Sequence, residues 1–169
     1  VEQVDDLDLP QLVAPDNILE PIAVAEAIVA GYPDQPQITH NSPSHPRYIP
    51  SYDRIEMPPD QSWQNTHGYY EALFHEMGHS TGHSKRLDRK GITEFDHFGS
   101  DNYGKEELIA ELVSAFLCQE AGIERQTIDN LAAYIKNWQT KIKGDKTIVI
   151  QSATAAQRAA DLILGRGRE

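Results

Sequence analysis

The chain has 169 residues, of which 39 % are hydrophobic, and this is enough for one domain with an apolar core. Lysine and arginine number 15 against 26 aspartates and glutamates, so the formal net charge is −11. Because contacts to phosphate dominate nucleic-acid affinity, we expect no nucleic acid to bind this domain alone. We also expect no membrane association, because no apolar run approaches the ~20 residues of a membrane span and no signal sequence opens the chain. The single Cys118 lies among apolar residues and is expected in the core, which fits a reducing intracellular compartment.

The two ends of the chain differ in composition from its middle. Residues 1–17 are acidic and are interrupted by Pro10 and Pro15, so we expect a linker or arm there. Helical and extended patterns occupy residues 18–165, which we assign to one domain, followed by a tail at residues 166–169.

Apolar periodicity and turn residues within this domain predict a mostly helical α+β fold with a small mixed β-sheet or hairpin. The expected helices cover residues 18–31 (with Pro21 in the first turn), 66–83, 105–118, 128–142 and 149–164. The expected extended stretches are Gln37–His40, Arg47–Pro50 and Arg54–Met57, the last two joined by a turn at Ser51–Asp53.

Prolines at positions 46, 50 and 58 flank these stretches and cannot donate ladder hydrogen bonds, which indicates an exposed sheet edge. Such an edge could hold an extended peptide by strand addition. Alternatively, the hairpin could merely cover the core, and the sequence leaves both interpretations open.

The sequence His75-Glu76-Met77-Gly78-His79 lies in the second expected helix. A helix turns once per ~3.6 residues, so histidines four residues apart share one face and both rings can reach one zinc ion. Glu76 flanks that site but is poorly placed as a third ligand, which is the geometry of a general base for a metal-bound water. The alternative is a surface helix that carries these residues by chance.

The opposite face of this helix favours the metal site. Its apolar residues recur at helical spacing and would pack on the core, which leaves the histidines facing a cleft. These residues are Tyr70, Leu73, Phe74, Met77 and Thr81.

The next expected helix carries two carboxylates one turn apart. Glu107 and Glu111 share a strip beside the face that we expect to be buried, whereas Glu106 is expected to point away. Carboxylates so placed repel each other unless a positive group lies between them, and a zinc ion held by two histidines is such a group. A solvated pair of glutamates is the alternative. The expected buried residues of this helix are Leu108, Leu112, Ala115 and Phe116.

A zinc ion that catalyses hydrolysis needs at least three protein ligands and one open position. The metzincin pattern is excluded because Lys85 occupies the place of its third histidine. His83 is the local rival, yet ligands at three successive turns of one straight helix converge poorly on a tetrahedral ion. A glutamate from the next helix, as in gluzincins, is the remaining candidate.

Several segments carry motifs that occur together in one known family: Arg47–Pro58, Tyr69-Tyr70, Phe74–His83, Arg86-Leu87, Phe98-Gly99, Tyr103 and Glu106–Cys118. Together they resemble the zincin-like metallopeptidase domain at the C-terminal end of ArdC-type antirestriction proteins and TraC-type primases of conjugative plasmids. The resemblance covers roughly residues 18–165 and implies an accessory protein of mobile DNA in a bacterial cytoplasm. In that family a single-stranded-DNA-binding domain precedes this one.

The gluzincin resemblance implies a zincin-like fold, Glu107 as the third zinc ligand and Glu111 as an acid that hydrogen-bonds a zinc histidine. The function implied is hydrolysis of a peptide or protein substrate, with Glu76 accepting a proton and passing it to the leaving amine. The alternative is a binding module without catalysis, in which the metal is structural. Candidate stabilisers of the oxyanion, among which the sequence does not choose, are Tyr48, His83, His97 and Tyr103.

Overall fold

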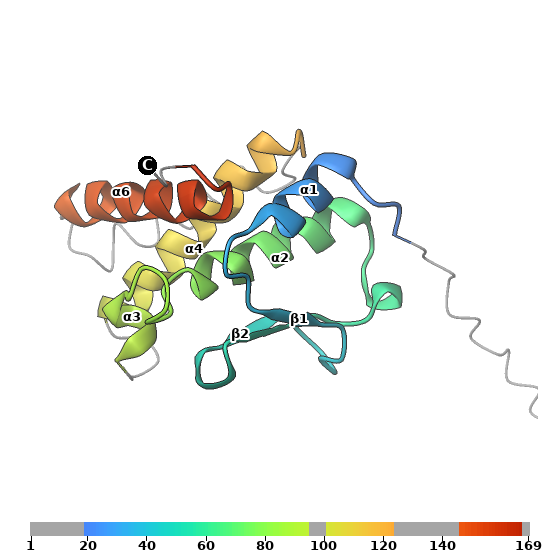
Figure 1. Cartoon of the computed structure of the whole chain (residues 1–169), viewed down its shortest axis with the longest axis horizontal. Helices are drawn as coiled ribbons and strands as arrows, with labels where there is room; N and C mark the ends of the chain where they lie inside the picture. Colours follow the sequence, from blue (N-terminus) through green and yellow to red (C-terminus); the bar gives the residue numbers. More distant parts are fainter. Residues whose placement is uncertain (1–18, 95–100, 124–145, 167–169) are drawn as a thin grey trace, which may run out of the picture.

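The computed structural model describes residues 19–94, 101–123 and 146–166 (Figure 1). The expected acidic arm, the helix at 128–142, His97 and the end of the tail lie outside these residues. The helices are α1 (Ala23–Gly31), α2 (Thr66–Ser80), α3 (Lys90–Thr93), α4 (Asp101–Glu120) and α6 (Lys146–Ile163). The strands are β1 (Gln37–Thr39), β2 (Arg47–Ile49) and β3 (Arg54–Glu56), with short 3-10 turns η1 (Pro50–Tyr52) and η2 (Asp60–Ser62).

The three strands form the small mixed sheet that the sequence predicts, in the order β1-β3-β2. Central β3 runs parallel to β1 and antiparallel to β2, so that Ile55 lies opposite both Ile38 and Tyr48. The turn between β2 and β3 is made by η1 and by Asp53, whose φ of 47° is left-handed. Both β1 and β2 are edge strands of this sheet.

Helix α2 is built around the apolar stripe that the sequence predicts, and each residue of that stripe is buried. The Asn65 side chain caps the helix by accepting a hydrogen bond from the Gly68 N–H at 2.8 Å. The helix ends at Ser80, three residues before the predicted end. The Gly78 carbonyl group accepts hydrogen bonds from Thr81 Oγ1 and the Arg89 guanidinium, and the Gly82 N–H binds the His79 carbonyl instead. The helical ladder is thereby interrupted.

Helix α1 also differs from the prediction, because it begins at Ala23 and Pro21 precedes it. Its Ile22 N-cap residue is extended, with φ −91° and ψ 110°. At the other end of the chain, α6 begins three residues before the predicted helix and ends at Ile163, one residue before the predicted end and shortly before Gly165, whose φ is 66°. A left-handed residue of this kind is a common helix stop.

The buried face of α4 is not the one predicted. Leu108 is buried, but Leu112, Ala115 and Phe116 are only half-buried. The side chains that α4 buries completely are on another stripe, which consists of Ala110, Val113, Leu117 and Cys118. Glu106 belongs to that stripe, so the prediction that it points away is wrong. The burial of Cys118 confirms the prediction of a core thiol.

The helices and the sheet form layers around α2 (Figure 1). Helix α2 (green) contacts strands β2 and β3 on one side and α4 (yellow) on the other, and α6 (red) packs on α4. The two helices expected to carry the site are therefore direct neighbours. No helix within the described ranges is long and apolar enough to cross a membrane.

The separation of α2 and α4 is set by a close approach at Gly78. A Cβ atom added to Gly78 would lie 3.0 Å from the Ala110 Cα atom and 3.2 Å from Val113 Cβ. Because the nearest atom belongs to the backbone of α4, the two helices would have to move apart.

We expect Gly78→Ala to destabilise the protein. Overpacking at this contact costs ~1–3 kcal/mol, whereas the higher helix propensity of alanine stabilises the helix by only ~1 kcal/mol. Gly68→Ala in the same helix is the matched control, because its added Cβ would make only an ordinary contact of 3.5 Å with Asn65. Urea unfolding should therefore show a lower free energy of unfolding for Gly78→Ala and an equal or higher one for Gly68→Ala. Equal stabilisation by both changes would contradict the close approach.

Candidate metal centre

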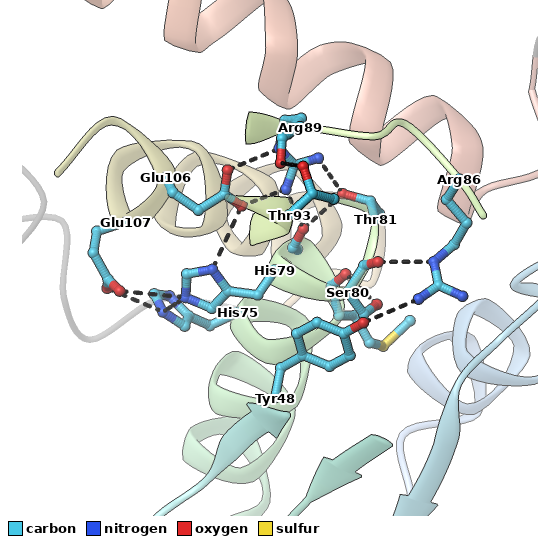
Figure 2. A network of polar contacts seen from close by, with 12 residues as sticks. Tyr48, His75, His79, Ser80, Thr81, Arg86, Arg89, Thr93, Glu106 and Glu107 are labelled. Carbon is cyan, nitrogen blue, oxygen red and sulfur yellow. Dashed lines mark hydrogen bonds and ion pairs between the residues drawn. The ribbon is translucent and has the colours of Figure 1, made fainter. Parts of the chain in front are cut away.

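His75 and His79 on α2 and Glu107 on α4 point toward one another (Figure 2). The two Nε2 atoms are 3.1 Å apart, and the Glu107 carboxylate oxygens lie 3.7 Å from His75 Nε2 and 3.6 Å from His79 Nε2. Ligand atoms arranged tetrahedrally around zinc at ~2.0–2.2 Å are about 3.4 Å apart. The spacing of the three side chains thus fits one divalent ion. Within the described residues they form the one group of this kind.

Each histidine also faces a carboxylate with its other ring nitrogen. His75 Nδ1 lies 3.3 Å from Glu111 Oε2, which is the contact that the predicted orienting role of Glu111 requires. His79 Nδ1 lies 3.5 Å from Glu106 Oε1. Glu106 thus faces the site, and its orientation corrects the expectation from sequence.

The carboxylates dominate the electrostatics of this group. Burial lowers the pKa of His75, but Glu107 and Glu111 outweigh that effect and raise the pKa to about 10. Burial raises the pKa of Glu106, but hydrogen bonds from Arg89 and the contact with His79 bring it below its ordinary value. The metal-free site therefore attracts positive charge, which a proton on His75 or a divalent cation can supply.

A cleft of about 340 Å³ opens onto these residues. One wall comes from α2 and α4, and another from β2 and the residues beside it. Glu76 reaches the cleft although its side chain is only 9 % exposed. The lining residues are Pro46, Arg47, Tyr48, Pro50, His75, Glu76, His79, Ile92 and Glu107.

The other candidate residues occupy different positions. His83 Nδ1 lies 3.8 Å from Asp53 and accepts a hydrogen bond from the Lys85 N–H, and His83 is not part of the three-residue group. Tyr48 lines the cleft, but its hydroxyl group donates to Asp53 Oδ1 at 2.9 Å. The Tyr48 hydroxyl group, a candidate stabiliser of the oxyanion, thus already donates its hydrogen within the protein. Neither His97 nor the side chain of Tyr103 lies within the described residues.

An ion pair of Arg86 with Asp53 fixes the β2–β3 turn against the end of α2. The Arg86 side chain, which is 2 % exposed, donates to the Ser80 carbonyl group at 2.7 Å and to both Asp53 oxygens. Arg86 also donates to the Tyr48 hydroxyl at 3.3 Å (Figure 2). In the sequence Arg86 stands out only as part of a motif, and no periodic pattern indicates its partner.

The sequence contains a signal for the burial of Glu106. Glu106, Ala110, Val113 and Leu117 recur at helical spacing, and a carboxylate on such a stripe is expected to be buried and paired. Its partner Arg89 lies seventeen positions earlier in the chain, so helical spacing cannot indicate that contact.

Comparison with known proteins agrees with the geometry. Residues 24–156 match the family described as zincin-like metallopeptidase. DNA primase TraC of Escherichia coli is 34 % identical over 164 residues, which cover 96 % of this chain and 15 % of TraC. An uncharacterized protein of Sinorhizobium fredii, y4eC, is 34 % identical over 114 residues, or 68 % of this chain and 36 % of that protein.

Two crystal structures of the antirestriction protein ArdC from the R388 plasmid are also similar, both at 34 % identity. The Mn(II)-bound structure has a TM-score of 0.66 and the match covers 88 % of this chain and 53 % of ArdC. For the metal-free structure the TM-score is 0.65, with 90 % and 54 % covered. This chain thus spans about half of ArdC and a smaller share of the curated relatives.

The fold is therefore zincin-like, and the chain belongs to the zincin-like metallopeptidase family. Within that family it is similar to ArdC and TraC, as the sequence motifs predict.

Proposed function

We propose that this domain is a zinc-dependent metallopeptidase. The observation that carries the proposal is the convergence of His75, His79 and Glu107 in a cleft that Glu76 also reaches. Two imidazole nitrogens and one carboxylate are a donor set that suits zinc, and they leave a coordination position for substrate and water. ArdC, to which this chain is similar, has been crystallised with Mn(II) bound, which supports a divalent ion in this protein as well.

In this proposal His75, His79 and Glu107 hold the ion, while Glu111 accepts the Nδ1 hydrogen of His75 and fixes its ring. A zinc ion bound there supplies Lewis acidity, which polarises a peptide carbonyl and lowers the pKa of water. The Glu76 carboxylate accepts the proton released from water as the carbonyl carbon is attacked. It then donates that proton to the amine that leaves.

The cleft also suggests how a substrate is held. Strand β2 is an edge of the sheet and contributes Arg47 and Tyr48 to the cleft wall. An extended peptide beside β2 would add a strand to the sheet and lie across the proposed ion site. We therefore favour strand addition over a hairpin that merely covers the core.

For the whole protein we propose a role like that of its named relatives, in a plasmid or phage-encoded antirestriction or conjugation protein of the bacterial cytoplasm. The similarity to ArdC and TraC supports this role. The domain itself would act on a peptide or protein, since its net charge of −11 disfavours nucleic acid.

The proposal is tested with a library of unstructured peptides. Cleavage should stop after chelation of the metal and return when zinc is added. If the protein retains stoichiometric metal but cleaves no peptide or unfolded protein, the alternative of a binding module with a structural metal is favoured.

We expect the purified protein to carry about one divalent ion per chain, and His75→Ala or His79→Ala to abolish that stoichiometric binding. Each change removes one of the three proposed protein donors. Metal content can be measured by elemental analysis after dialysis. The exposed His67→Ala on the same helix is the control and should retain the ion. Full metal content in both site variants would contradict the proposed centre.

A further inference from the structure

Arg89 and Glu106 form a buried ion pair behind His79 (Figure 2). Glu106 is 4 % exposed, and Arg89 donates hydrogen bonds to both of its carboxylate oxygens, from Nε at 2.9 Å and from Nη2. The same guanidinium donates to Thr81 Oγ1 at 2.6 Å and to the Gly78 carbonyl at 2.9 Å. Arg89 thus joins the end of α2 to the Glu106 carboxylate on α4.

The surroundings of the His79 ring favour a proton on Nδ1 rather than on Nε2. Among the described residues, the buried His79 Nδ1 has no hydrogen-bond partner within normal length, and Glu106 Oε1 lies 3.5 Å from it. The 3.1 Å contact between the two histidine Nε2 atoms requires one donor and one acceptor. When His79 carries its proton on Nδ1, its Nε2 is free to accept, and that is also the state in which it can bind a metal.

We propose that the Arg89–Glu106 pair positions His79 as a metal ligand by holding its ring with Nδ1–H toward Glu106 and Nε2 toward the cleft. This inference rests on the metal centre of the proposed function. It adds Arg89 and Glu106 as positioning residues for His79, beside Glu111 for His75.

The geometry explains why both members of the pair are needed. A carboxylate as deeply buried as Glu106 requires a cation, which Arg89 supplies. The planar guanidinium also fixes the direction of the carboxylate through two hydrogen bonds, which a lysine ammonium cannot reproduce. The side chain of Glu106 is thereby held at the back of the His79 ring.

The pair of Arg86 with Asp53 provides a matched control. Arg86 is also a buried arginine that donates to a carbonyl group at the end of α2, here Ser80, and to a carboxylate. Its partner Asp53 contacts His83 and not the histidines of the metal centre. A purely structural effect of removing an arginine from this region should therefore appear in Arg86→Lys as well.

The test compares Glu106→Gln, Arg89→Lys and Arg86→Lys with the wild-type protein. Zinc affinity is measured by competition with a chromogenic chelator, stability by urea unfolding, and the position of the His79 ring proton by ¹⁵N NMR of the metal-free protein. We expect Glu106→Gln and Arg89→Lys to weaken zinc binding by ~10–100-fold. Arg86→Lys should bind zinc as the wild type does, even if it lowers the free energy of unfolding equally.

In the metal-free wild type we expect the His79 proton on Nδ1, and in Glu106→Gln a mixture of both ring tautomers. Unchanged zinc affinity in both site variants, equal weakening in all three variants, or a proton that remains on the same nitrogen in Glu106→Gln would overturn the inference. If Glu106→Gln does not fold, Arg89→Lys decides by the same measurements. Failure of the wild type to bind zinc would refute the proposed function. The NMR measurement uses metal-free protein, so it tests the effect of Glu106 on the His79 ring independently of zinc binding.

Discussion

Glu107→Ala is expected to remove stoichiometric zinc binding, whereas Glu111→Ala should weaken it by ~10–100-fold, the range typical of residues that orient a ligand. The two carboxylates are one turn apart on α4, and they face different atoms. Glu107 lies toward the Nε2 atoms of both histidines, and Glu111 lies behind one ring, at His75 Nδ1.

The difference in expected size follows from these contacts. Without Glu107, the centre would retain two protein donors and lose the negative charge nearest the ion. Without Glu111, all three donors remain, but His75 loses the acceptor that fixes its ring and raises its basicity. Removing either carboxylate also removes one of the groups that raise the pKa of His75.

Zinc affinity of both variants can be measured by isothermal titration at one pH and ionic strength. Glu120→Ala is a suitable control, because Glu120 is also on α4 and its ion pair with Arg166 is solvent-exposed. Affinity in the control should equal that of the wild type. If Glu111→Ala lost the metal while Glu107→Ala retained it, the roles of the two glutamates would be reversed and the gluzincin-like arrangement would stand. Retention of the metal by both variants would exclude a glutamate ligand from α4.

The parts of the fold that the sequence predicts well are those with a single apolar face. In α2, the stripe from Tyr70 to Thr81 has polar residues opposite it, so periodicity alone identifies the buried side and places the histidines on the other. The strand pattern also specifies the β2–β3 hairpin, because a turn separates two short extended stretches.

Helix α4 could not be oriented in this way, because it carries apolar residues on more than one face. Periodicity fits both the stripe of Leu108 and Leu112 and the stripe of Ala110 and Val113. The close approach of Ala110 to Gly78 decides between them, and such a contact belongs to the tertiary structure. The buried position of Glu106 follows from that choice. His75, His79 and Glu107 lie together, as the motifs and the family resemblance predict. The pairing of Arg89 with Glu106 instead depends on the conformation of the segment that carries Arg89, which periodicity does not predict.

Glu76→Gln is expected to retain the fold and the metal while hydrolysis falls by the ~10²–10⁴-fold that general acid–base catalysis typically contributes. Glutamine has nearly the same shape as glutamate, so the packing around this 9 % exposed side chain should persist. The carboxamide cannot accept the proton that leaves water, nor return it to the amine. The three proposed ligands are unchanged, so zinc affinity should remain close to that of the wild type.

The same substitution at Glu71, on the same helix but not among the residues that line the cleft, is the matched control and should leave hydrolysis within about twofold. Cleavage rates of one peptide are compared for wild type, Glu76→Gln and Glu71→Gln at equal zinc occupancy, which elemental analysis verifies. Loss of activity together with loss of zinc would assign Glu76 to the structure of the site and not to proton transfer. Wild-type activity in zinc-loaded Glu76→Gln would show that another group accepts the proton, and Glu76 would then have no catalytic role in the cleft.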